Sequence, residues 1–307
     1  MQVFSRSAKL MGNIFSFSVV AEREKLAYDL IEIAINEIRR IERLFTTFDP
    51  DSETNRINDA AGIKPVHVDA EMFGLIARSI AISGITQGAF DISYGSIDKS
   101  LWNFDKNMKS LPDPLVAKKM VHLINYRNIE LDEEKRTVFL KEKGMRIGFG
   151  GIGKGYAAEM AKKLLRAKGV ESGIINASGD LTAWGLQPSG KPWNIGIASP
   201  DRPDFPFSYL EISEKAVATS GNYEKFVLID GKKYSHTIDP KTGMPITGIK
   251  SITVICQNAE LADAMATPIG VMGIKAGLDL VDQIPNMHCI IIDDHNKVHS
   301  SKNINLL

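Results

Sequence analysis

The pattern of apolar residues changes once along this chain of 307 residues, near residue 127. Before that point, apolar residues recur at helical spacing over 24–46, and a second helical pattern covers about 70–86. After it, short apolar stretches typical of strands predominate, with helical patterns only at 153–168 and about 259–283. Because helices cluster early and strands late, without regular alternation, we predict an α+β fold in one domain spanning residues 1–307.

The remaining elements are expected from local patterns. Pro50 is expected to end the first helix, and a third helix is expected over 113–123. Strands are expected at the segments "IFSFSVV", "NIELD", "TVFL", "MRIGF", "SGIINAS", "WNIGIAS", "YLEIS", "AVATSG", "KFVLID", "SITVIC" and "CIIID".

Charge and cysteine content exclude several classes of protein. Lys+Arg and Asp+Glu are equal at 37 each, so no net field attracts nucleic acid or an anionic membrane. No apolar run approaches the ~20 residues of a transmembrane segment. Cys256 and Cys289 lie in apolar stretches without metal-type spacing, which predicts two buried strand thiols. The first twenty residues lack the continuous apolar region of an export signal.

A glycine-rich stretch, "RIGFGGIGKGYAAEM" at 146–160, matches two nucleotide-binding fingerprints at once, G-x-G-x-x-G and G-x-x-x-x-G-K. The second fingerprint needs a Ser or Thr where Gly155 stands, and the first needs an alternating βα sheet, whereas mostly strands follow. The stretch still leads from a predicted strand into a predicted helix, where backbone N–H groups and Lys154 can face a phosphate. Two interpretations of this stretch remain open: a loop that contacts an anion, or a tight turn that packs a strand against a helix.

Two further segments carry polar side chains. In "LADAMATPIG", Asp263 and Thr267 are four residues apart, so a helix places their oxygens on one face, and Pro268 removes one helical N–H and is expected to push Thr267 out of helical geometry. Such an all-oxygen set suits Mg²⁺, although a proline-kinked helix explains the segment equally well. In "YSHTIDPKTGMP", His236 lies between hydroxyl residues before a turn; taken alone, it fits a structural role better than a catalytic one.

Taken in order, these pieces resemble the ApbE-type flavin transferases, the FAD:protein FMN transferases. The resemblance covers nearly the whole chain and depends on an ordered set of motifs: "LMGNIFSF", "IERLFTTFDPDSETNRIN", "GAFDISYGSIDKSLWNF", "GFGGIGKGYAAEMA", "NASGDLTAWG", "AVATSGNYE", "YSHTIDPKTGMPI" and "ADAMAT". It implies helices packed around a β-rich core, and an enzyme that binds FAD with Mg²⁺, transfers the FMN half to a threonine of an acceptor protein and releases AMP.

The resemblance also implies site residues. The positions expected to contact FAD are Met11, Phe48, Ala89, Phe90, Asp91, Lys154 and His236. Those expected to bind magnesium are Asp263 and Thr267 through their side chains, and Gly151 and Ala266 through their backbone oxygens. His236 is the favoured general base for the attacking threonine, with Asp91 as the alternative. The glycine-rich stretch then resembles neither fingerprint but the family's own loop.

The chain departs from the family pattern at two positions. Gly148 stands where the family usually has an Asp at the head of the glycine-rich loop, and Asn13 stands where it usually has a Thr. Two rival functions remain: hydrolysis of FAD to FMN and AMP, and flavin binding without turnover. The acceptor motif implied is a Thr preceded by Asp-Gly-Ala or Ser-Gly-Ala. Family members are commonly exported, yet no leader is visible in this sequence. A cytoplasmic location is therefore expected if the sequence is complete, and a periplasmic or membrane-associated one if a leader was trimmed.

Overall fold

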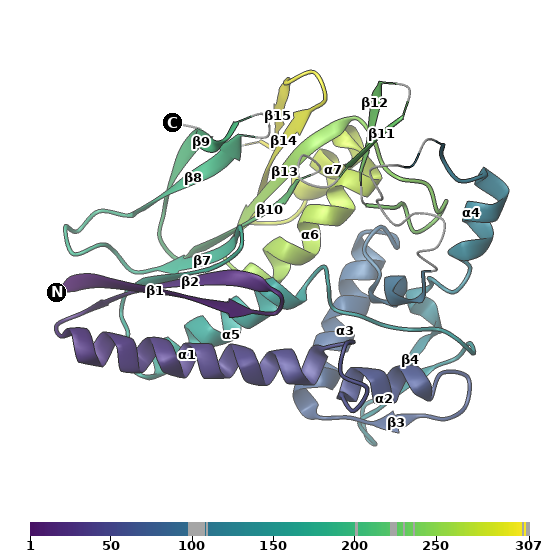
Figure 1. Cartoon of the computed structure of the whole chain (residues 1–307), viewed down its shortest axis with the longest axis horizontal. Coiled ribbons are helices and arrows are strands. Elements are labelled where there is room, and N and C mark those ends of the chain that lie inside the picture. The colour runs from purple at the N-terminus through teal and green to yellow at the C-terminus, as the bar shows by residue number, and fades with distance from the viewer. Residues whose placement is uncertain are drawn as a thin grey trace.

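The chain folds around one antiparallel sheet of eight strands (Figure 1). The structure, a computed structural model, describes residues 1–97, 108, 110–199, 202–221, 226–229, 231–235, 237–302 and 304. Every neighbouring pair in it is antiparallel. The strands in spatial order are β1 (Gln2–Leu10), β2 (Asn13–Ala21), β6 (Gly173–Ala177), β7 (Asp180–Trp184), β10 (Lys215–Gly221), β13 (Ile249–Cys256), β14 (His288–Asp293) and β15 (Val298–Ser300).

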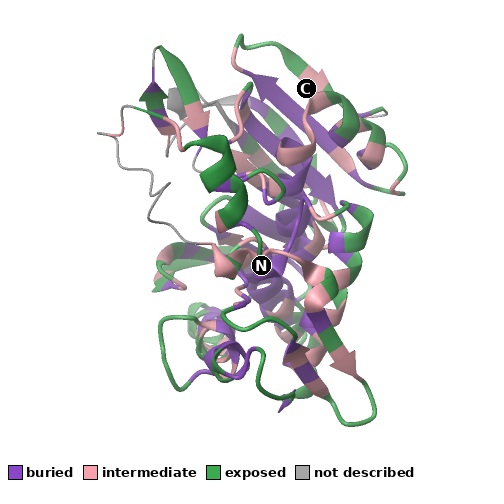
Figure 2. Ribbon diagram, turned by 90° about the vertical axis from the view of Figure 1, so that its right-hand side faces the viewer, coloured by how far each residue is buried: buried purple, intermediate pink, exposed green. Residues whose placement is uncertain are grey.

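The two faces of this sheet bury different cores, because successive side chains of a strand point to opposite faces. On β10, Ala216 and Ala218 belong to the larger core, whereas Val217 between them belongs to a second one. On β14, Ile291 likewise belongs to the larger core and Ile290 to the second one. The second core is closed by the hairpin β8 (Trp193–Ser199) and β9 (Arg202–Ile212), which contributes Trp193 and Leu210. In Figure 2 the strands inside the molecule are accordingly coloured as buried.

Three helices cover the face of the larger core: α1 (Glu24–Phe45), α5 (Gly153–Ala167) and α6 (Ala259–Met272). Helix α5 is central, since it contacts α1, α6, β6 and β7. Gly155 permits the close approach of α5 to α6, because a Cβ at this position would lie 2.1 Å from the carbonyl oxygen of Ala259. Helix α7 (Ile274–Val281) follows α6 after Gly273, whose φ of +83° ends the first helix.

A smaller part of the chain lies beside the main sheet (Figure 1). It contains the three-stranded sheet β3 (Val66–His67), β5 (Thr137–Leu140) and β4 (Ile129–Asp132), with the helices α2 (Glu53–Asp59), α3 (Ala70–Ile85) and α4 (Pro114–Met120) and the short 3₁₀ helices Ile92–Ser96 and Tyr126–Asn128. A two-stranded hairpin, β11 (Phe226–Ile229) and β12 (Lys232–Ser235), completes the elements of the described residues.

The α+β prediction is confirmed, and the antiparallel main sheet agrees with the rejection of a dinucleotide-binding βα sheet. The first helix, predicted over 24–46, ends at Phe45, one residue from its predicted end, so Pro50 lies five residues beyond the helix. The predicted helix 259–283 is wrong as one element: it is two helices separated at Gly273. Thr267 was expected to leave helical geometry before Pro268, but α6 continues through both residues. The elements that were not predicted include the strands β1, β3, β7 and β15 and the helix α2.

The segment "MRIGF", residues 145–149, was predicted as a strand and is not one. A side chain takes the place of a neighbouring strand: Asn58 Oδ1 accepts a hydrogen bond from the Ile147 N–H at 2.7 Å, and Asn58 Nδ2 donates to the Ile147 carbonyl at 3.1 Å. The N–H of Gly148 donates to the carbonyl of Ile92 at 2.9 Å. These contacts satisfy the backbone N–H and C=O groups of this segment without pairing to a neighbouring strand, and they fix the start of the glycine-rich loop.

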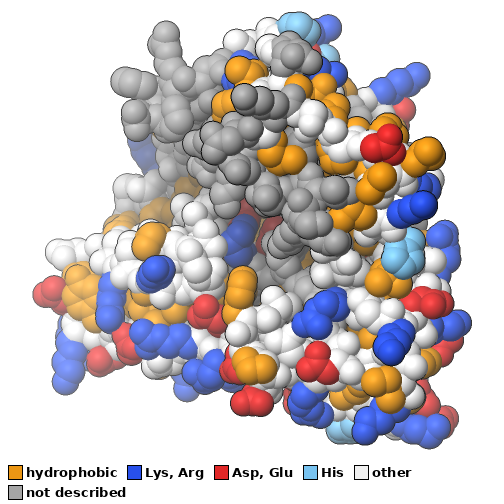
Figure 3. All heavy atoms as spheres, turned by 45° about the vertical axis from the view of Figure 1, so that its right-hand side comes forward, with side chains coloured by type: hydrophobic (Ala, Val, Ile, Leu, Met, Phe, Trp, Pro, Cys, Tyr) orange, Lys and Arg blue, Asp and Glu red, His pale blue; other side chains and the backbone are white. Residues whose placement is uncertain are grey.

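Both cysteines are buried, as predicted. Among the described residues, no helix combines the length and the apolar character required to cross a bilayer. The face seen in Figure 3 carries acidic and basic side chains close together rather than a field of one sign.

Candidate functional site

The glycine-rich loop ends in the N-terminus of α5, and two acidic side chains from other elements meet it there. Lys154 forms an ion pair with Asp180, the first residue of β7. The backbone N–H of Gly155 donates to Asp263 Oδ2 of α6 at 2.9 Å. Asp180 and Asp263 are only 4% and 7% exposed, whereas the Lys154 side chain is 27% exposed. One partly exposed cation therefore stands between two buried carboxylates.

The sequence of each element explains why these groups converge. Asn258 caps α6, since its Oδ1 accepts from the Leu261 N–H at 3.1 Å, and the helix then carries Asp263 one turn past its start. Ser178 and Gly179, both with positive φ, form the tight turn between β6 and β7 that places Asp180 at the head of its strand. Because Gly155 has no side chain, the first turn of α5 lies against α6 at this level.

Burial raises the pKa of the Asp263 carboxyl, while the charge of Lys154 and the hydrogen bond from the Gly155 N–H act in the opposite direction. A carboxylate that is costly to charge when buried is stabilised by a nearby cation. The Thr267 hydroxyl lies four residues further along the same helix, and Thr267 is half-buried. Among the described residues no cluster of three His, Cys, Asp or Glu side chains could hold a metal. A cation at this position would therefore be bound by Asp263 together with hydroxyl and carbonyl oxygens, a donor set that fits Mg²⁺.

Two apolar side chains border the same loop. The Cε of Met11 lies 3.5 Å from the position that a Cβ of Gly153 would occupy, and Cε2 of Phe90 lies 3.7 Å from the corresponding position of Gly151. Met11 and Gly12 form a two-residue turn between β1 and β2, with φ of +50° and +73°. The left-handed backbone at Met11 is uncommon for a residue with a side chain and is typical of functional positions.

Asp91 lies next to Phe90 but is occupied by internal hydrogen bonds. Its Oδ1 accepts from the N–H of Ser93 at 2.8 Å and from the Ser93 hydroxyl at 2.6 Å, and its Oδ2 accepts from the Tyr126 N–H at 2.7 Å. Burial raises its pKa, and these hydrogen bonds oppose the rise. A carboxylate with both oxygens engaged is better suited to holding the segment 89–93 in place than to accepting a proton from a substrate.

Phe48 is almost fully exposed, at 97%, which is unusual for a large apolar side chain in the described part of the chain. It follows α1 next to Thr47, whose Cγ2 lies 3.7 Å from the position of a Gly148 Cβ. Phe48 is therefore close in sequence to the residue that touches the head of the glycine-rich loop. Ala89 is buried beside Phe90, and Ala266 is buried within α6.

His236 lies outside the described residues, but its neighbours on both sides are described. The N–H of Ser235 donates to the Ile246 carbonyl at 3.1 Å, and the Ile246 N–H donates to the Thr237 carbonyl at 3.0 Å. Burial raises the pKa of Tyr94 to about 12, against the effect of a hydrogen bond with the backbone of Ile238. Ile238 therefore lies against the 3₁₀ helix that Asp91 caps.

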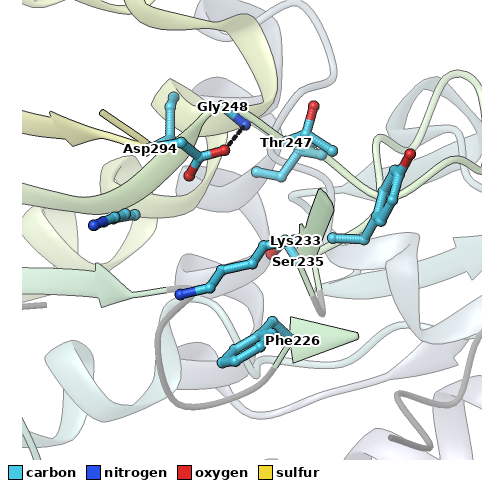
Figure 4. Close-up of a pocket in the computed structure, with 10 residues that line it drawn as sticks. Phe226, Lys233, Ser235, Thr247, Gly248 and Asp294 are labelled. Atoms are coloured by element: carbon cyan, nitrogen blue, oxygen red, sulfur yellow. Dashed lines mark hydrogen bonds between the residues drawn. The ribbon is translucent and has the colours of Figure 1, made fainter. Parts of the chain in front are cut away.

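A pocket beside Ser235 is shown in Figure 4. Residues from β11, β12, the loop before β13, the start of β13 and the loop after β14 line it: Phe226, Lys233, Tyr234, Ser235, Ile246, Thr247, Gly248, Ile249, Lys250 and Asp294. The Gly248 N–H donates to Asp294 Oδ2 at 3.0 Å, and Lys233 Nζ lies 4.8 Å from the centre of the Phe226 ring. None of its lining residues belongs to the Lys154–Asp180–Asp263 group, so the two features are distinct.

A hydrogen-bonded cluster fixes α3, which leads into the segment 89–91. The Tyr156 hydroxyl donates to Glu71 Oε1 at 2.6 Å, and Glu71 in turn accepts from Arg40 of α1 at 2.6 and 2.9 Å. Burial, followed by the Glu71 carboxylate, raises the pKa of the Tyr156 hydroxyl. Arg78 of α3 donates to Glu260 of α6 at 2.6 Å. The helices around the loop are thereby joined by polar contacts as well as by packing.

The structure brings together five of the eleven residues expected from the sequence. Met11, Phe90, Gly151, Lys154 and Asp263 surround one loop, and Asp180 was missed. The signal available for Asp180 was its place after a Ser-Gly turn in "NASGDLTAWG", a motif that was noted without a role for its acid.

Comparisons with known proteins show what the whole chain and its fold are similar to. A family model described as "ApbE family" matches residues 11–291. A curated FAD:protein FMN transferase of Klebsiella pneumoniae is 31% identical over 97% of this chain and 91% of its own length. One from Treponema pallidum is 28% identical over 98% and 87%, respectively. The crystal structure of the ApbE protein of Thermotoga maritima superposes with a TM-score of 0.87 at 29% identity, over 98% of this chain and 97% of that one.

Proposed function

The chain belongs to the ApbE family, and we propose that it is an FAD:protein FMN transferase. The single observation that supports this best is the meeting of Lys154, the N-terminus of α5 and Asp263 at the end of the glycine-rich loop. A helix N-terminus and a lysine attract a pyrophosphate, and the buried carboxylate with a neighbouring hydroxyl fits a divalent cation. The relatives' names supply the donor, FAD.

In the proposed reaction the hydroxyl of an acceptor threonine attacks the FMN phosphorus of FAD. The new P–O bond forms to the threonine, the bond to the AMP oxygen breaks, and AMP leaves. Lys154 and the backbone N–H groups at the start of α5 hold the pyrophosphate and stabilise its charge, which is the main contribution in phosphoryl transfer. The side chains of Asp263 and Thr267, with backbone oxygens of Gly151 and Ala266, would hold Mg²⁺, and the chemistry it would supply there is neutralisation of negative charge on the leaving phosphate.

The other side chains around the loop have roles in placing FAD. Met11 and Phe90 border the loop as apolar contacts, and the exposed Phe48 offers a ring face on which a flavin or adenine ring can stack. Asp91 and Ala89 hold the segment that presents Phe90. The hydrogen bonds within that segment leave His236, rather than Asp91, as the proposed general base. The whole chain is proposed to act as one domain.

The test is mass spectrometry of a peptide that carries Asp-Gly-Ala-Thr, incubated with the protein, FAD and Mg²⁺. A gain of one FMN on the threonine, abolished by EDTA, is the expected result. Free FMN and AMP with an unmodified peptide would instead show a pyrophosphatase. Binding of FAD without any AMP would show a flavin-binding protein.

Replacement of His236 by Ala is expected to lower turnover more than FAD affinity. A general base contributes roughly 10²- to 10⁴-fold to the rate of the chemical step, whereas its loss removes little ground-state binding. Turnover is measured by AMP release with saturating peptide, and affinity by quenching of flavin fluorescence. A variant that loses affinity with unchanged turnover would assign His236 to binding.

A further inference from the structure

Two charged side chains of α5 are buried behind the Lys154–Asp180–Asp263 group. Glu159 and Lys162 are 4% and 6% exposed, and the Lys162 Nζ lies 2.8 Å from one carboxylate oxygen of Glu159 and 3.0 Å from the other. Removal of two charges from water is costly, and their mutual attraction often fails to offset it fully. Apolar side chains of similar size would fill this space at no such cost, so the pair calls for an explanation other than stability.

Each member of the pair also contacts a different neighbouring element. Lys162 Nζ donates to the Thr182 hydroxyl at 3.1 Å, on β7 and two residues after Asp180. Glu159 Oε2 accepts from the backbone N–H of Ala259 at 3.1 Å, at the first residue of α6 and one turn before Asp263. The pair therefore joins the three elements that supply Lys154, Asp180 and Asp263.

The contact with Ala259 is made on two sides. The Ala259 carbonyl oxygen faces Gly155, where a Cβ would lie 2.1 Å from it, and the Ala259 N–H is held by Glu159, one turn further along the same face of α5. The first residue of α6 is thus fixed along the axis of α5 by one steric contact and one charge-assisted hydrogen bond. A shift of α6 along α5 would move Asp263 relative to Lys154.

We propose that Glu159 and Lys162 are positioning residues, which hold α5, β7 and α6 in the register that places Lys154, Asp180 and Asp263 around the phosphate-binding loop. The effect on turnover rests on the proposed function; the effect on register does not. Neither side chain reaches the loop itself in the described contacts. They act through Thr182 and Ala259.

Two double variants separate register from stability. Glu159→Leu with Lys162→Met removes both charges at similar volume and leaves the Ala259 N–H without its acceptor. Glu159→Gln with Lys162→Met also removes both charges but keeps an acceptor oxygen for that N–H. The first is expected to raise the Mg²⁺ concentration for half-maximal AMP release about 10-fold, as supporting contacts of metal ligands do, and the second to recover most of this loss.

The matched control is Leu165→Ala, which opens a cavity under a fully buried side chain further along α5. It is expected to lower the melting temperature and to leave the Mg²⁺ requirement unchanged. If the Mg²⁺ requirement rose in proportion to the loss of melting temperature in all three variants, the pair would act only through stability, and the proposal would be overturned.

Hydrogen–deuterium exchange provides a readout without FAD or metal. In the Leu-Met variant, peptides covering 180–184 and 259–263 are expected to exchange faster than in the wild type, with 288–293 unchanged. If the wild type releases no AMP but these peptides still respond, the proposed function fails and the positioning role stands. If they exchange at the wild-type rate, the positioning role fails, whatever the activity.

Discussion

Replacing Asp263 by Asn is expected to lower the rate of FMN transfer about 1000-fold, equivalent to ~4 kcal/mol of transition-state stabilisation. The amide keeps the shape of the side chain and an oxygen to accept from the Gly155 N–H. It removes the charge proposed to hold Mg²⁺. AMP release over a range of Mg²⁺ concentrations measures the effect. Asp279→Asn, at an exposed position of α7, is the matched control and should retain full activity.

The same variant should remain folded, and the sign of the pKa shift gives the reason. The pKa of Asp263 is raised in the folded protein, so the folded state binds the proton more tightly than the unfolded chain does. This contribution to stability is fully present below the unfolded value of 3.8 and is lost as the pH rises through the folded pKa. At pH 7 without Mg²⁺, the Asn variant is therefore expected to melt at the same temperature as the wild type or above it, and the difference should disappear at low pH. Melting well below the wild type at pH 7, or activity near that of the wild type, would contradict the assignment.

Replacing Gly155 by Ala is expected to destabilise the protein by about 2–3 kcal/mol through overpacking, which for a chain of this length corresponds to a melting temperature lower by roughly 3–5 °C. The added methyl would lie 2.1 Å from the Ala259 carbonyl oxygen and 2.6 Å from the Asp263 Cβ, so α5 and α6 would have to separate. Since Asp263 moves with α6, transfer activity is expected to fall with stability. Thermal unfolding and AMP release measure the two effects.

Gly84→Ala is the control for this substitution. Gly84 lies within α3, and a Cβ there would meet no atom within 4 Å, so the same change should leave the melting temperature unchanged or raise it, given the higher helix propensity of Ala. Equal melting temperatures for the two variants would show that the contact between α5 and α6 is not tight.

The structure also explains why Gly155 departs from the G-x-x-x-x-G-K-Ser/Thr fingerprint. The Ser or Thr of that fingerprint cannot be accommodated where the helix touches α6. The antiparallel sheet likewise removes the dinucleotide fingerprint. The glycine spacing matched both fingerprints, but each already failed a second criterion in the sequence; the packing of α5 against α6 adds the physical reason why Gly155 cannot be a Ser or Thr.

Long periodic segments were predictable, because their apolar faces are recorded in sequence. The helices α1, α3 and α5 were placed to within a residue or two. The strand predicted at 145–149 failed because the side chain of Asn58, from a distant helix, satisfies its backbone. In the last predicted helix, the interruption was expected at Thr267 and Pro268. Pro268 instead lies inside α6, and Gly273, with its positive φ, ends that helix.

At the site, the residues implied by family resemblance could be named in advance, but their partners could not. Asp180 meets Lys154 only through the pairing of β7 with β6. Glu159 and Lys162 were not singled out from the sequence, because charged residues of an amphipathic helix commonly face solvent. They are buried because α5 is covered by helices and by the sheet, an arrangement that the periodicity of one segment does not reveal.

The central place of α5 has a consequence for how the chain matures. The helix is synthesised roughly halfway along the chain, but the contacts that complete its surroundings come from α1 before it and from α6 about 100 residues later, as the Glu159–Ala259 and Gly155–Asp263 bonds show. During synthesis, the glycine-rich loop is therefore made about 100 residues before Asp263, the acid that binds the N–H of Gly155. Such distant pairing slows folding, and the proposed metal and phosphate contacts can form only after the residues of α6 have been added.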